Sequence, residues 1–186
     1  FRYRAEYEVV AMLIDKGADV NIVENISNWT ALHFACGNRA APEVVALLLE
    51  KGADVHALDQ DNRTSHHIAA MDTEVGLEVF ELLLANAANV NAVDNENKTA
   101  LHYVANTFKG TEVVELLLAD RRVDPNITSV NGWTAIHFAA NNNNMAVLKA
   151  LLSDDRTIRT RPTAGHNFEN LQLAQDHYDV ALREVK

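Results

Sequence analysis

Residues 44–55 read VVALLLEKGADV and join a dense apolar run to an abrupt polar turn. The valines and leucines fit the buried face of a helix. Gly52 follows this run, where a helix commonly ends on a left-handed residue. Similar apolar blocks occur at residues 9–14, 79–84 and 113–118, so this stretch is one copy of a repeat.

A second motif precedes each of the last three apolar blocks and recurs once more near the end of the chain. Residues 30–33 read TALH, and related tetrads occupy residues 64–67, 99–102 and 134–137, at spacings of 34, 35 and 35. A third series lies at residues 19–21, 54–56, 89–91 and 124–126, each 35 apart. The threonines suit helix starts, where a hydroxyl accepts from an unpaired backbone N–H. Three interleaved series with one period predict a short helix, a turn and a longer helix in every repeat. One such pair cannot hide its own apolar face, so the pairs are expected to stack.

These motifs resemble the ankyrin repeat family. The family pattern is nearly verbatim in residues 44–55, and in residues 30–35 apart from Ala31, which replaces a proline. The resemblance covers almost the whole chain. It implies an all-α fold, an ankyrin-repeat solenoid of stacked antiparallel helix pairs with β-hairpin finger loops. It further implies that partners bind at the fingers and at the concave helix face.

We expect one ankyrin-repeat domain over residues 1–186. The period divides it into a partial repeat at 1–28, full repeats at 29–62, 63–97, 98–132 and 133–165, and a degenerate capping repeat at 166–186. The partial repeat lacks its first helix motif, and the chain starts at Phe1 rather than Met. We therefore expect the chain to be part of a longer protein.

The repeat at residues 63–97 departs most from the pattern. His66 stands where an apolar core residue is expected, and Ala87 stands where glycine would close the helix. A left-handed alanine is strained. We expect this repeat to be the least stable.

Charge and composition narrow the range of partners. The formal net charge is −10, and a surface this acidic repels phosphate backbones, so no nucleic acid is expected. No apolar run approaches the roughly 20 residues that span a bilayer, so no membrane insertion is expected. The expected partner is another protein or peptide with a basic or apolar surface.

Cys36 is the only cysteine, so no intramolecular disulfide can form, which fits a cytoplasmic, intracellular location. Oligomeric state is not indicated.

Four histidines at the repeat period, His33, His67, His102 and His137, suggest a metal site at first sight. Stacked helices lie about 10 Å apart, whereas ligands of one zinc ion lie about 2 Å from it. These histidines are instead expected to hydrogen-bond the backbone of neighbouring turns. Cys36 is expected to be a buried, inert thiol, and no catalytic motif occurs. We therefore expect no enzyme activity, no catalytic residues, no metal and no cofactor.

The residues just before the four threonines are the candidate partner-binding positions: Trp29, Arg63, Lys98 and Trp133. The resemblance implies that these are variable contact positions, and both tryptophans of the chain occupy them. Tryptophan is a common interface anchor. Two interpretations stay open: each tryptophan contacts a partner, or each packs over its own finger and stiffens it.

The sequence thus predicts a non-catalytic protein–protein interaction module that binds through finger loops and the concave helix face, within a larger scaffold, adaptor or regulatory protein. The alternative is the targeting region of an enzyme whose catalytic domain lies outside these residues. A spacer that contacts no partner is a further alternative. Fold alone does not decide among them.

Overall fold

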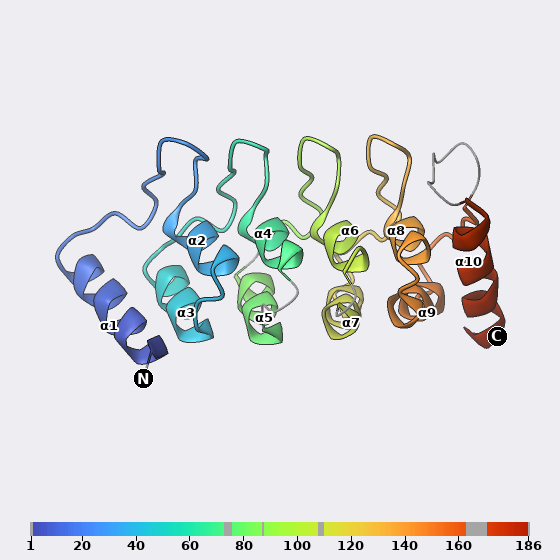
Figure 1. The fold of residues 1–186 in the computed structure, drawn as a ribbon. Coiled ribbons are helices and arrows are strands. Elements are labelled where there is room, and N and C mark those ends of the chain that lie inside the picture. Colours follow the sequence, from blue (N-terminus) through green and yellow to red (C-terminus); the bar gives the residue numbers. More distant parts are fainter. Residues whose placement is uncertain (1, 73–75, 87, 108–109, 163–170, 186) are drawn as a thin grey trace. The chain divides into compact units, whose positions relative to one another are not determined.

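The computed structural model describes residues 2–72, 76–86, 88–107, 110–162 and 171–185. Over these residues the chain forms ten α-helices and no strand (Figure 1). It divides into two compact units, Phe1–Ala92 and Val93–Lys186.

The N-terminal unit stacks alternating short and long helices. They are α1 (Arg2–Asp15), α2 (Ala31–Gly37), α3 (Pro42–Glu50), α4 (Ser65–Met71) and α5 (Leu77–Ala85). Helix α2 packs against both α3 and α4, while α3 contacts α1 and α5. Between neighbouring repeats, short helices therefore contact short helices and long helices contact long helices. Leu32, Val45 and Leu83 are fully buried between them, and Phe80 nearly so.

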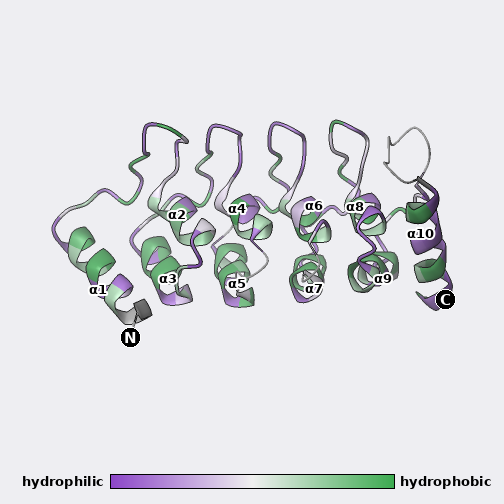
Figure 2. Ribbon diagram, viewed as in Figure 1, coloured by the Kyte–Doolittle hydropathy of each residue, from purple (hydrophilic) through white to green (hydrophobic). Residues whose placement is uncertain are grey.

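The C-terminal unit repeats this arrangement and closes it with a long last helix. Its elements are α6 (Ala100–Ala105), α7 (Thr111–Ala119), α8 (Ala135–Asn141), α9 (Met145–Ser153) and α10 (Leu171–Val185). Helix α6 packs against α7 and α8, and α10 contacts α8 and α9. In both units the hydrophobic residues concentrate in the helices, whereas the loops beyond the short helices are mainly hydrophilic (Figure 2).

Each of the four short helices begins with the same reciprocal cap. In α2, the hydroxyl of Thr30 accepts from the His33 backbone N–H, while the Thr30 N–H donates to His33 Nδ1 at 3.2 Å. Thr64, Thr99 and Thr134 form the same capping box. This cap gives a hydrogen-bond acceptor to two backbone N–H groups that would otherwise lack one at the start of the helix.

Two of these histidines also tie one repeat to the next. His33 Nε2 donates to the carbonyl of Arg63, and His102 Nε2 donates to the carbonyl of Trp133, each at 3.1 Å. Because Nδ1 accepts and Nε2 donates, each ring is the neutral Nε2–H tautomer. For His33 and His102 this confirms the predicted bond to a neighbouring turn.

The finger loops are the connections at residues 23–29, 58–63, 93–98 and 128–133 (Figure 1). Each is closed at its base by a backbone bond, such as Asp59 N–H to Arg63 O at 3.0 Å. In the last three fingers a second backbone bond spans the turn, such as Asn62 N–H to Asp59 O at 3.0 Å. The fingers turn on residues with positive φ: Asn28, Asn62, Asn97 and Gly132. Asparagine and glycine tolerate that region best. None of the described residues is assigned to a strand, so the finger loops that the resemblance implied are short turns without a β-ladder.

The position of His66 in α4 bears on the predicted weak repeat. His66 is only 2 % exposed, and the equivalent positions in the other repeats hold the buried apolar residues Leu32, Leu101 and Ile136. Beside it, the buried hydroxyl of Ser65 has no hydrogen-bond partner. Ala87 lies outside the described residues. Burying polar groups costs more than burying leucine, so α4 carries two unfavourable residues.

Replacing His66 with leucine is expected to raise the free energy of unfolding by about 1 kcal/mol. The reason is that an apolar side chain of similar size would occupy a position that is already closed to solvent. Urea unfolding measures the change. In the unmodified chain, amide hydrogen exchange is expected to be faster in α4 than in α2. His56→Ala, at an exposed position, serves as the control and should change little. A less stable His66→Leu variant, or equal protection of the two helices, would contradict the weak-repeat hypothesis.

Candidate partner-binding site

Trp29 lies at the base of the first finger and is half-buried by its own repeat. Its indole meets the Phe34 ring edge-on, with centroids 5.1 Å apart, and stacks at 6.3 Å from the His33 ring. The indole N–H donates to Asp59 on the next finger at 3.3 Å. These contacts hold the indole in one orientation with part of its surface open to solvent.

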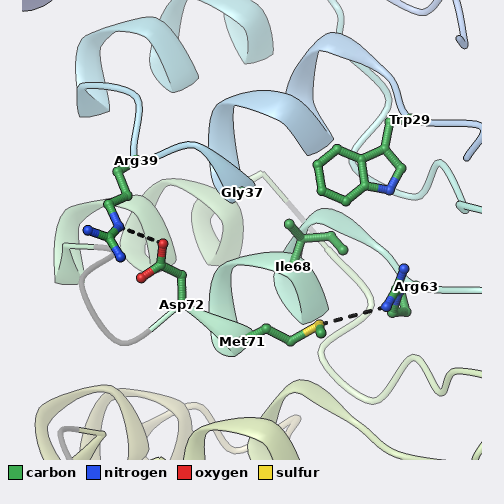
Figure 3. Close-up of a pocket in the computed structure, with 7 residues that line it drawn as sticks. All are labelled: Trp29, Gly37, Arg39, Arg63, Ile68, Met71 and Asp72. Atoms are coloured by element: carbon green, nitrogen blue, oxygen red, sulfur yellow. Dashed lines mark hydrogen bonds and ion pairs between the residues drawn. The ribbon is translucent and has the colours of Figure 1, made fainter.

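An open pocket of about 380 Å³ lies beside that exposed indole surface, between α2 and α4. It is lined by Trp29, Gly37, Arg39, Arg63, Ile68, Met71 and Asp72. In Figure 3 the indole of Trp29 lies over Ile68, with the Arg39–Asp72 pair at one end and Arg63 with Met71 at the other.

Gly37, at the end of α2, lies close to two of the side chains that line the pocket, Trp29 and Ile68. A Cβ placed there would lie 3.0 Å from both Ile68 and the Trp29 ring, which is tighter than ordinary van der Waals contact. An alanine there would require Ile68 or the indole to shift by a few tenths of an ångström. Glycine at this position therefore helps Trp29 and Ile68 lie close to α2.

The charges around the pocket are compensated. Arg39 Nε donates to Asp72 at 2.7 Å, and the Arg63 guanidinium pairs with Asp59 and Asp61 at 2.8 Å each. Burial would raise the pKa of Asp59, but hydrogen bonds from the Arg63 backbone and guanidinium hold it below its usual value. Both guanidinium groups thus face carboxylates rather than an empty anion site.

The C-terminal unit places its two candidate residues around one phenylalanine. The indole of Trp133 meets the Phe138 ring edge-on at 4.9 Å. The Lys98 ammonium lies 5.5 Å from the centre of the same ring and 5.6 Å from that of Tyr103. Here a cation, rather than an open pocket, lies against the aromatic side chains.

The repeated helix pairs with their capping boxes agree with a comparison against known families. The family model for ankyrin repeats, which spans three copies, matches residues 2–94, 41–129, 66–163 and 103–181. The chain belongs to the ankyrin repeat family. A comparison with curated proteins finds no match. Ankyrin repeats are generally protein–protein interaction modules and are typically non-catalytic.

In this ankyrin-repeat protein the four candidate residues fall into two pairs. Trp29 and Arg63 line one pocket and share Asp59 as a hydrogen-bond acceptor. Lys98 and Trp133 both contact Phe138. Each tryptophan packs on a phenylalanine of the short helix of its own repeat rather than over its own finger. Trp29 also lines a pocket, so its packing leaves part of the indole available to a partner.

Sequence reasoning missed most of the pocket. Arg39 and Asp72 follow the short helices α2 and α4, and Met71 is the last residue of α4; none of these positions carries a repeat motif. Arg39 itself has a positive φ of 56°. Two polar finger residues, Asp59 and Ser129, are buried, at 4 % and 5 % exposure. Their side chains accept bonds from the backbone of their own fingers.

The other candidate groups are structural. Cys36 is 1 % exposed, and burial raises the pKa of its thiol to about 12, so it is a poor nucleophile. Across the described part of the ankyrin-repeat protein, no three histidine, cysteine or acidic residues gather as metal ligands. Nor is any helix among the described residues both long and apolar enough to cross a bilayer.

Proposed function

We propose that this chain is a non-catalytic module that binds another protein or peptide, with the pocket beside Trp29 as its main anchor site. The observation that supports this is the half-buried indole, held by Phe34 and Asp59, which opens onto a pocket lined by apolar side chains in its middle and by ion-paired side chains at its ends. Rigid aromatic side chains beside pockets are the usual energetic centres of protein interfaces.

The size and chemistry of the pocket favour an apolar side chain of the partner. A volume of about 380 Å³ has room for one or two side chains of a partner. Met71, which lines the pocket, is 47 % exposed, and Phe34, which contacts Trp29, is 43 % exposed. Apolar surface therefore continues out of the pocket. Because Arg39 and Arg63 are already paired with carboxylates, an anion gains little here.

The wider surroundings of the module are part of the same proposal. We place it inside a cell, as part of a scaffold, adaptor or regulatory protein. The net charge of −10 supports a partner whose surface around the anchor is basic. The buried, unpaired thiol of Cys36 is compatible with a reducing compartment.

Peptides selected from a random display library for binding to the unmodified chain serve as the test ligands. These peptides are expected to lose about 30-fold in affinity for Trp29→Ala, the loss typical of a central interface anchor. Met71→Ala should weaken binding to a smaller degree. Titration calorimetry measures both effects, and circular dichroism checks that each variant is folded.

Trp133→Ala provides the matched control, because it removes an indole with the same packing on its own phenylalanine but with no part in this pocket. Its binding should be unchanged. Peptides that bind Trp29→Ala as tightly as the unmodified chain, or a library that yields no binder at all, would overturn the proposal.

A further inference from the structure

The aromatic side chains of the C-terminal unit already hold a cation. The Lys98 ammonium lies 5.6 Å from the centre of the Tyr103 ring on α6 and 5.5 Å from that of Phe138 on α8. Both distances are within the roughly 6 Å at which a ring face attracts a cation. The His102 ring meets Phe138 edge-on at 5.6 Å, and Trp133 does so at 4.9 Å. These two contacts hold the Phe138 ring in place.

Carboxylates strengthen the attraction for a positive charge. Glu96 forms an ion pair with the Lys98 ammonium. Asp94, which is buried, accepts a hydrogen bond from the Tyr103 hydroxyl and so fixes that ring. A cation between the two rings therefore meets two aromatic faces with negative charge close by.

The finger holds the backbone of Lys98 independently of its ammonium. The Lys98 N–H donates to Asp94 Oδ1 at 2.9 Å, and its carbonyl accepts from the Asp94 N–H at 3.0 Å. The side chain is 22 % exposed, and its ammonium pairs with Glu96 on the same finger. Displacing the ammonium from the rings would leave these backbone bonds intact, and Glu96 would then be available to pair with the incoming cation.

We propose that Tyr103 and Phe138 form a binding site for an alkylammonium group, which Lys98 fills in the free chain and a lysine side chain of a protein partner fills in the complex. The group that lies against both rings in the structure is the primary ammonium of Lys98, which indicates that the site accepts an alkylammonium group. The net charge of −10 favours the approach of a cationic segment. The partner role rests on the proposed function, whereas the preference for an alkylammonium group does not.

Choline tests this preference directly, with 3,3-dimethyl-1-butanol as its neutral isostere. Ring signals of Phe138 and Tyr103, followed by NMR during titration, report binding at the site. Choline is expected to bind Lys98→Ala at least about fivefold more tightly than the unmodified chain, because an internal competitor lowers the measured affinity by the fraction of molecules in which it occupies the site. The neutral alcohol should bind neither protein measurably.

Two variants separate the site from a general charge effect. Lys149→Ala removes another ion-paired lysine, the partner of Glu184 on α10, and should leave choline affinity unchanged. Adding Phe138→Leu to Lys98→Ala keeps the charge constant and should abolish the gain. The proposal is overturned if Lys98→Ala binds choline no more tightly, if Lys149→Ala gains equally, or if the alcohol binds as well as choline. Failure of peptide selection at Trp29 would leave this outcome unaffected.

Discussion

Lowering the pH from 7 to about 4 is expected to remove about 3 kcal/mol from the free energy of unfolding through His102 alone. Burial lowers the pKa of His102 from 6.5 to about 4 in the folded chain. Unfolded chains bind the proton at the ordinary pKa, so stability is complete above pH 6.5 and falls as the pH drops towards 4. The pKa of His33 is also lowered by burial, which adds to the loss in the same direction.

Protonation of His102 would also break the capping box at the start of α6. Nδ1 of His102 accepts from the Thr99 N–H at 3.0 Å, while Nε2 donates to the Trp133 carbonyl. A protonated imidazole has no acceptor left, so the cap would break. The pKa of Glu24 is lowered from 4.5 to about 2, and the pKa values of Asp59, Asp120 and Asp154 are also lowered, so these carboxylates begin to lose their stabilising contributions below about pH 5. The part of the loss between pH 6.5 and about 5 is therefore the part that reports the histidines.

Urea unfolding at several pH values between 7 and 4 measures the effect. His102→Gln should flatten the profile, since glutamine at this position can still accept from the cap backbone but does not titrate. His56→Gln, at an exposed histidine, should leave the profile unchanged. A stability that is constant over this window, or one that falls as steeply in His102→Gln, would show that His102 does not control it.

Gly110→Ala is expected to cost about 2–3 kcal/mol, the upper part of the range for overpacking a buried site. The added Cβ would lie 2.4 Å from Val104 Cγ1 and 2.7 Å from the Val104 carbonyl oxygen. Because the second of these atoms belongs to the backbone, a rotamer change cannot relieve the overlap. The turn between α6 and α7 would have to move.

Gly76→Ala is the matched control, because Gly76 also caps the second helix of its repeat and a Cβ there meets nothing within 4 Å. With φ at −66°, alanine is unstrained there, and the variant should be unchanged or slightly more stable. Thermal unfolding compares the two substitutions. Equal effects would show that the structure around Gly110 is looser than its contacts indicate.

The repeat architecture was predictable because its signals are local. A helix face needs apolar residues three and four apart, and a capping box needs a threonine three residues before its partner. Both patterns are visible within residues 30–50, and their recurrence predicted the ankyrin fold that the family model confirms. The threonines at the helix starts followed from the same register, whereas the part of the histidines in the capping boxes came from the structure. Tryptophan at equivalent positions indicated where a partner would be contacted, which stays a prediction.

The pocket and the occupied aromatic site were not predictable, because both depend on residues brought together by stacking. Arg39 and Asp72 are 33 residues apart, and Lys98 reaches Phe138 from the preceding repeat. Gly76 and Gly110 show the same difference between what a local sequence pattern determines and what packing determines. The sequence by itself determines that a glycine precedes α5 and another precedes α7, since that is a local property of the chain. Only the tertiary structure decides that one glycine borders open space and the other a carbonyl oxygen, because that distance depends on how the chain folds back around the position.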